Sequence, residues 1–363
     1  MKSEMRHIGW WLSSTLMLLL LMMVSCSQDS SNDGIDEPQN NLLRLSSVTR
    51  SSSEFTPSEG NSIKMYVMTK NAQFSTGTFT YSTGWTNNNV SVKEYEQYYM
   101  YGFMPAGSYS SSISATATEL NGDYSRGADL TINALPIFTS KDFCAIVGVQ
   151  RISATTEATN IVEGNYGYLS GLNSENYVNL LMDHLYGELA LQFKVDADYY
   201  ALRHIKLKSV TLNYDNGQGS VDAKVNVTVR LRAGNGLGQS SVVYTPTGNT
   251  ASHTFLENGS QFLTDAATLI GNPVDNPVGN PVKCPPSLFD QAGTYMTLTC
   301  TYDVCRTDNA NTVIRANCTA SNKMRVSGMD HGKTNTVTVT IAPTYLYVLT
   351  DPDLDNPTIY IGG

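Results

Sequence analysis

The sequence predicts an all-β protein built from two tandem β-sandwich domains. Short segments in which apolar and polar residues alternate recur along the chain, as with Val337, Val339 and Ile341 between threonines. Stretches with the longer period of an amphipathic helix are scarce. Charged residues make up only 15% of the chain, whereas Ser, Thr, Asn and Gly are abundant. This composition is typical of an extracellular β protein, and 363 residues are enough for two domains.

The chain begins with a predicted lipoprotein signal peptide, residues 1–25. Lys2 and Arg6 give it a basic start. The uninterrupted apolar run that follows, residues 16–24, is much shorter than the ~20 residues of a membrane-spanning helix. A small residue directly before Cys26 completes the pattern of a lipobox. We therefore expect Cys26 to carry acyl chains, palmitate among them, that hold the mature protein in the outer membrane.

Residues 26–50 are predicted to be a lipidated tether and a removable leader strand. The tether, up to residue 41, is polar and acidic, so we expect it to be disordered. Residues 42–48 are an apolar, strand-like patch with Arg44 inside it. Arg50 follows among Ser and Thr residues, which predicts an open loop that a protease can enter.

An N-terminal sandwich domain is predicted over residues 51–182 and a C-terminal one over residues 183–363. Alternating or aromatic-rich segments between Gly, Ser and Asn turns predict their strands. In the first domain these segments are residues 63–68, 78–81, 98–104, 128–135, 143–149 and 177–182. In the second they are residues 185–195, 205–213, 223–231, 295–302, 336–341, 345–349 and 358–361. One helix is expected over residues 260–270, with Ser260 as its N-cap.

The C-terminal stretch resembles a known family. Ala342-Pro-Thr-Tyr-Leu-Tyr-Val-Leu-Thr-Asp-Pro-Asp-Leu-Asp-Asn-Pro357 is similar to the C-terminal signature of fimbrillins, the lipoprotein-precursor pilus subunits of Bacteroides-type bacteria, including the Mfa-like branch. The segments 98–105 and 184–212 also resemble fimbrillin strands. The resemblance implies that each domain is a transthyretin-like sandwich. It also implies an arginine-directed protease that removes the leader and the first strand, here by cutting after Arg50 or Arg44.

The family resemblance implies a structural subunit of a cell-surface fimbria that serves adhesion. Its partners would be other fimbrial subunits, the outer membrane before processing, and a host or bacterial surface ligand. The alternatives are a tip or anchor fimbrillin, or a monomeric surface lipoprotein that binds glycan through exposed aromatic residues such as Trp85.

The terminal strand is the predicted donor for polymerisation. Thr358, Ile359, Tyr360 and Ile361 alternate in polarity after a turn over residues 351–357. Removal of residues 42–48 would leave a groove that accepts such a strand from another subunit. The alternative is that this strand completes the sheet of its own domain.

Motifs for catalysis, metal binding or cofactor binding are not found in the sequence. GxSxG, HExxH and CxxC patterns are missing, and the histidines lack ligand spacing. Asp351, Asp353 and Asp355 have the spacing that opens a calcium loop, but Pro352 and Gly362 depart from that motif and predict a turn. We expect no enzymatic activity, no metal and no cofactor, and the net charge of −9 disfavours nucleic acid as a partner.

The cysteines permit a disulfide in the second domain. Besides Cys26, the chain has Cys144 within an apolar run, where we expect a small core residue. The other four are Cys284, Cys300, Cys305 and Cys318, and an exported protein can form a pair among them.

Overall fold

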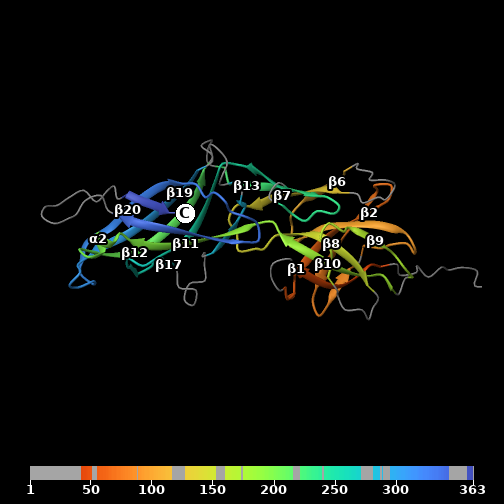
Figure 1. Cartoon of the computed structure of the whole chain (residues 1–363), viewed down its shortest axis with the longest axis horizontal. Coiled ribbons are helices and arrows are strands. Elements are labelled where there is room, and N and C mark those ends of the chain that lie inside the picture. The colour runs from red at the N-terminus through yellow and green to blue at the C-terminus, as the bar shows by residue number, and fades with distance from the viewer. Residues whose placement is uncertain are drawn as a thin grey trace, which may run out of the picture. The chain divides into compact units, whose positions relative to one another are not determined.

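The computed structural model describes residues 42–50, 55–87, 89–116, 127–152, 160–172, 175–215, 221–238, 241–270, 281–286, 288, 295–342 and 358–362. It confirms the all-β prediction, with one short helix, α2 (Ala197–Tyr200), in this described part (Figure 1). No helix among these residues is long and apolar enough to cross a membrane. Cys26, the tether, the predicted strand at 345–349 and the turn at 351–357 lie outside the described residues.

The first sheet has eight strands in the order β1-β10-β8-β5-β2-β3-β4, with β9 paired to β5. They are β1 (Arg44–Arg50), β2 (Ser62–Thr69), β3 (Phe74–Tyr81), β4 (Trp85–Asn87), β5 (Gln97–Met104), β8 (Cys144–Ile152), β9 (Gly167–Leu169) and β10 (Tyr177–His184). Only the β1–β10 pair among these is parallel. The sheet curls so that β1 and β4, at its two ends, contact each other.

A second layer covers one face of this sheet. It has four strands in the order β14-β13-β7-β6. They are β6 (Ser111–Ala115), β7 (Ala128–Pro136), β13 (Lys224–Leu231) and β14 (Val242–Thr247). Val227 and Val229 of β13 share a buried core with Tyr101 and Phe103 of β5.

The predicted domain boundary between residues 182 and 183 does not separate the strands of this layer. β13 and β14 come from the C-terminal side of that boundary, yet β13 pairs with β7 from its N-terminal side. Alternation along β13 shows that it is a strand with one buried face. It does not show which distant strand lies beside it, and so the pairing of β13 with β7 was not predicted.

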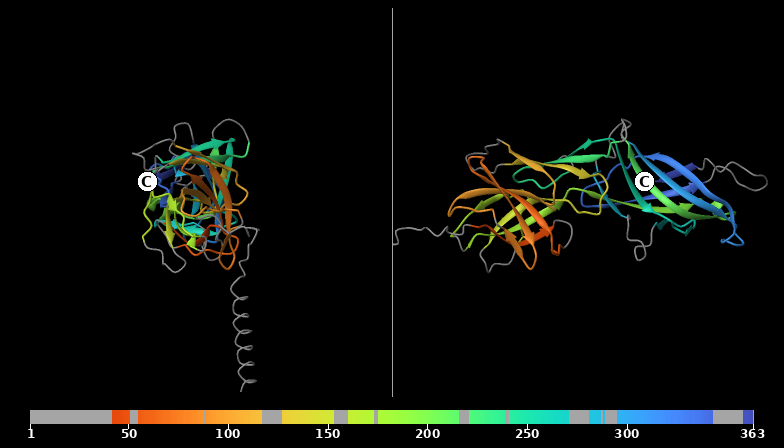
Figure 2. Two further views of the ribbon diagram at one scale, coloured as in Figure 1. Left: turned by 90° about the vertical axis from the view of Figure 1, so that its right-hand side faces the viewer. Right: turned by 180° about the vertical axis from the view of Figure 1, so that it is seen from behind.

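Two five-stranded sheets form the second sandwich, seen from behind in Figure 2. One is β17-β11-β21-β22, with β18 on β11, and the other is β15-β12-β19-β20, with β16 on β12. The strands are β11 (Gly187–Val195), β12 (His204–Asp215), β15 (Thr250–Leu256), β16 (Gln261–Leu263), β17 (Thr268–Leu269), β18 (Val282–Cys284), β19 (Tyr295–Cys305), β20 (Val313–Met324), β21 (Thr334–Ala342) and β22 (Thr358–Gly362). Leu191 and Val339 from the first sheet share a core with Leu212 and Leu298 from the second.

The helix predicted over residues 260–270 is wrong. This segment contains β16, which pairs with β12, and β17, which pairs with β11. Each strand is only two or three residues long, so the local sequence pattern is weak and pairing with long neighbouring strands decides its structure. Helix α2 follows Asp196, whose carboxylate accepts hydrogen bonds from the backbone of Asp198 and Tyr199.

No disulfide pair forms among the cysteines of the second sandwich. Cys284, Cys300 and Cys305 are free, buried thiols, and Cys318 is also buried. Three of these residues belong to the same apolar core, where they pack as small hydrophobic side chains: Cys284, Cys300 and Cys318. Cys144 is fully buried, as its sequence context predicted.

A polar junction joins three strands of the second sandwich. Glu188 on β11 pairs with Lys283 on β18 and accepts a hydrogen bond of 2.7 Å from the hydroxyl of Thr334 on β21. Burial raises the pKa of Glu188, but the bonds from Lys283 and Thr334 outweigh it and hold that pKa below its ordinary value.

We expect the Glu188→Gln chain to lose less stability on acidification than the unsubstituted chain. A lowered folded-state pKa means that the carboxylate stabilises the fold above its unfolded pKa, and that this contribution disappears as the pH falls through the folded value. Thermal unfolding midpoints between about pH 7 and pH 3 measure the difference. Parallel curves for the two chains would contradict it.

Candidate functional site

β1 is an edge strand of the eight-stranded sheet. It pairs with β10 in parallel, from Arg44 beside Tyr177 to Arg50 beside Met182. On the side away from β10, a backbone hydrogen bond lies just before the strand begins: the N–H of Leu43 donates to the carbonyl of Val90 at 2.9 Å. The strand is therefore attached to the sheet mainly through one ladder of backbone hydrogen bonds.

Apolar side chains of β1 and of the residue before it fill the core inside the curled sheet. Leu43, Leu45 and Val48 are buried there together with Val178 and Leu180 of β10. Burial of an aliphatic side chain of this size contributes about 1.5–3 kcal/mol. Removal of β1 would thus leave both unpaired backbone groups on β10 and an open apolar groove.

Arg44 lies on the outside of the strand. Its guanidinium donates a 3.1 Å hydrogen bond to the hydroxyl of Tyr177 and stacks 5.4 Å from the centre of that ring. This contact is exposed. Arg44 therefore adds little to the attachment of the strand.

Arg50 does not lie in an open loop, and this part of the prediction is wrong. It is the last residue of β1, and its side chain is only 13% exposed. Nη1 lies 2.6 Å from Oδ2 of Asp142, and the guanidinium stacks 4.4 Å from the ring centre of Phe55. Asp142 is distant in the sequence, and so the local Ser/Thr composition gave no sign of this partner. Cleavage after Arg50 stays a prediction, and it requires that the end of β1 first leave these contacts.

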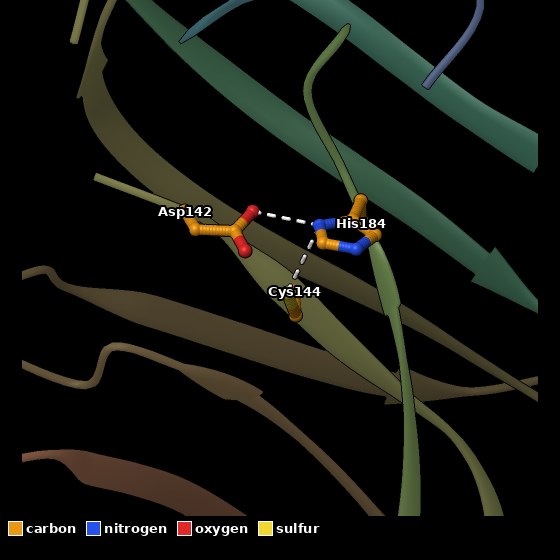
Figure 3. Close-up of side chains that lie close together, drawn as sticks. All are labelled: Asp142, Cys144 and His184. Carbon is orange, nitrogen blue, oxygen red and sulfur yellow. Dashed lines mark hydrogen bonds and ion pairs between the residues drawn. The ribbon is translucent and has the colours of Figure 1, made fainter. Parts of the chain in front are cut away.

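The carboxylate of Asp142 that contacts Arg50 also lies beside His184, which in turn lies beside Cys144 (Figure 3 shows the last three side chains). Its Oδ1 lies 2.8 Å from Nδ1 of His184, which in turn lies 3.7 Å from Sγ of Cys144. Burial raises the pKa of Asp142, but the hydrogen bond and charge of His184 and the charge of Arg50 outweigh it and hold that pKa below its ordinary value. Burial raises the pKa of the Cys144 thiol well above its ordinary value.

The cluster of Asp142, Cys144 and His184 was not predicted from the sequence. Asp142 and Cys144 are two positions apart, whereas His184 follows about forty positions later and reaches them only because it is paired with Cys144 across β10 and β8. The closeness of Asp142 and Cys144 in the sequence is a weak local signal, because Asp142 lies just before β8.

The terminal strand completes the sheet of its own sandwich. β22 pairs antiparallel with β21, with Ile361 beside Val339 and Ile359 beside Ile341. Thr358 and Tyr360 belong to the same ladder. β22 is thus an edge strand, like β1, but the two lie in different sheets and do not pair with each other. Whether β22 acts as a donor between subunits stays a prediction.

Trp85, the aromatic platform of the glycan-binding alternative, is partly buried. It packs against the core inside the curled sheet, and its ring meets that of Tyr81 edge-on at 5.3 Å. A sugar-stacking site needs an exposed ring face. The position of Trp85 therefore gives no support to this alternative.

The fold defines a class of protein, an all-β sandwich protein in which β1 and β22 are edge strands. Searches with family models and among curated proteins found no match. Among solved structures, a fimbrial protein from Bacteroides vulgatus is similar, with a TM-score of 0.50 and 10% identity, over 88% of this chain and 98% of that one. The fimbrial anchor protein Mfa2 from Porphyromonas gingivalis gives a TM-score of 0.32 and 9% identity, over 88% of this chain and 96% of that one. The likeness to fimbrillins expected from the C-terminal stretch is thus confirmed at the level of the fold, which this chain shares with the B. vulgatus protein.

Proposed function

We propose that this protein is a structural, non-catalytic subunit of a cell-surface fimbria and contributes to adhesion. The observation that carries the proposal is β1, an edge strand with two buried apolar side chains, a buried leucine just before it and a terminal arginine, in a fold shared with a fimbrial protein. Such a strand can be cut off as a unit. The groove that it leaves is then filled by a strand from another subunit.

The proposed pathway begins with a precursor anchored in the outer membrane through Cys26. An arginine-directed protease cuts after Arg50 and releases the anchor together with the apolar patch; a cut after Arg44, the alternative site, releases the anchor but leaves Leu45 and Val48 on the subunit. The exposed edge of β10 then accepts an extended segment, whose backbone restores the ladder and whose alternate side chains fill the places of Leu45 and Val48. Head-to-tail insertion of this kind does not close on itself, so it builds a filament.

Immunogold electron microscopy of sheared surface material tests this function. We expect label along the fibres of cells that produce the unsubstituted chain. With Cys26→Ser, we expect the chain to leave the outer-membrane fraction and the fibres to disappear, since the precursor is no longer held for processing.

The same images separate the alternatives. Label confined to the ends of fibres would place the protein at the tip or the anchor instead of the shaft. Unchanged membrane retention of Cys26→Ser would contradict the lipid anchor. A chain that stays in the membrane fraction as a monomer and never enters fibres would overturn the fimbrial function.

A further inference from the structure

Three side chains of metal-ligating types gather at the junction of β8 and β10 (Figure 3). Cys144 is the first residue of β8 and His184 lies opposite it in the antiparallel ladder, while Asp142 lies two residues before β8 and approaches His184 through its carboxylate. One ligand atom from each residue lies within 4.8 Å of the other two. Cys144 and His184 are buried, and Asp142 is half-buried. The arrangement is therefore prepositioned by the sheet and sheltered from bulk water.

The spacing suits a small tetrahedral ion. Bond lengths of ~2.3 Å to sulfur and ~2.0–2.2 Å to nitrogen or oxygen put the ligands of a zinc ion about 3.3–3.7 Å apart. Nδ1 of His184 already lies 3.7 Å from Sγ of Cys144. The 2.8 Å contact between His184 and Asp142 would have to widen by about half an ångström, which a side-chain rotation of Asp142 can supply.

A cation already lies beside the cluster. The guanidinium of Arg50 lies 2.6 Å from Oδ2 of Asp142, while Oδ1 of the same carboxylate faces His184. A divalent ion between the three ligands would lie close to this positive charge, and the two would repel each other strongly in a poorly hydrated place. Arg50 and a metal ion are therefore alternatives at this site.

We propose that Asp142, Cys144 and His184 form a binding site for a divalent transition metal of the zinc type, which Arg50 keeps closed while the end of β1 is docked. The mixed sulfur, nitrogen and oxygen donors favour such an ion over magnesium or calcium. On binding, the Cys144 thiol releases its proton to solvent as the metal–sulfur bond forms. His184 binds through neutral Nδ1, with its remaining proton on Nε2, and water completes the coordination.

The proposal goes beyond fimbrial assembly and does not depend on it. In a processed subunit, loss of Arg50 would open the site. The same opening can be produced by substitution in the uncut chain. A failure of cleavage or of polymerisation would therefore leave the metal test intact.

Cobalt(II) is the probe, because a thiolate bound to cobalt gives a charge-transfer absorption that other ligands do not. We expect the full-length Arg50→Ala and Arg50→Gln chains to bind one cobalt ion with this absorption, and zinc to displace it. The unsubstituted chain should bind at least roughly tenfold more weakly, since its guanidinium repels the ion. Arg44→Ala is the matched control, because Arg44 lies on the same strand and contacts Tyr177.

A second substitution assigns the ligand. Cys144→Ser in the Arg50→Gln background should abolish the absorption, while near-ultraviolet circular dichroism shows that the fold persists. The proposal is overturned if neither Arg50 variant shows the absorption, if Cys144→Ser leaves it in place, or if Arg44→Ala raises cobalt affinity as much as the Arg50 variants do.

Discussion

Treatment of the folded chain with an arginine-specific protease is expected to convert monomers into polymers, whereas the double variant Arg44→Ala/Arg50→Ala is expected to stay monomeric. Detachment of β1 uncovers the places of Leu43, Leu45 and Val48. Burial of each of these side chains contributes about 1.5–3 kcal/mol. An empty groove would therefore forfeit a large share of the free energy of unfolding of an ordinary domain. Insertion of a strand from another subunit restores most of it.

Size-exclusion chromatography and negative-stain electron microscopy measure the conversion, and N-terminal sequencing of the product identifies the cut. Cleavage after Arg50 gives a chain that starts at Ser51, and cleavage after Arg44 gives one that starts at Leu45. The single variants Arg44→Ala and Arg50→Ala are the controls, because each leaves one of the two arginines available to the protease. A fully cut chain that remains monomeric and folded would show that loss of β1 alone does not drive assembly.

We expect the contacts of Arg50 to slow this cleavage. A protease binds its substrate as an extended, accessible segment, whereas Arg50 is held by Asp142 and Phe55 at the end of a paired strand. Arg44 is exposed, but it lies within the ladder to β10. In both cases the strand must open locally before it is cut, so the process depends on the stability of the edge and not on a permanently open loop.

Much of the fold follows from the sequence, because a period of two reports both a strand and its buried face. The alternation at residues 336–341 corresponds to β21, and the apolar patch at 42–48 overlaps β1. The resemblance to fimbrillins, drawn mainly from the C-terminal stretch, anticipated a fold that the B. vulgatus fimbrial protein shares.

What the sequence did not reveal are contacts between distant segments. The pairing of β13 with β7, the contact of Arg50 with Asp142 and the meeting of Cys144 with His184 each join residues far apart in the chain. Local composition carries no information on such partners. The helix prediction over residues 260–270 was wrong for the same reason, because the short strands at 261–263 and 268–269 are determined by pairing with β12 and β11.

Deletion of residues 358–363 is expected to abolish polymerisation of the cut chain while leaving the precursor folded. β22 is a five-residue edge strand held to its own sheet by the single ladder with β21. Its release costs this ladder and its close approach to β20 of the other sheet, whereas we expect its insertion beside β10 in another subunit to close a groove that exposes a core. We therefore expect transfer only after β1 has been removed, with cleavage as the first step of assembly.

Two measurements make this deletion decisive. Thermal unfolding of the uncut, shortened chain shows whether loss of β22 damages the second sandwich, and a synthetic peptide of residues 357–363 tests the groove itself. The peptide should bind the cut, shortened chain one to one and should block polymerisation of the cut, full-length chain, because it occupies the same edge of β10. Undiminished polymers from the shortened chain would exclude β22 as the donor. A folded, shortened monomer that captures the peptide would identify both the donor strand and its acceptor, since β1 is absent from the cut chain and β22 from the shortened one.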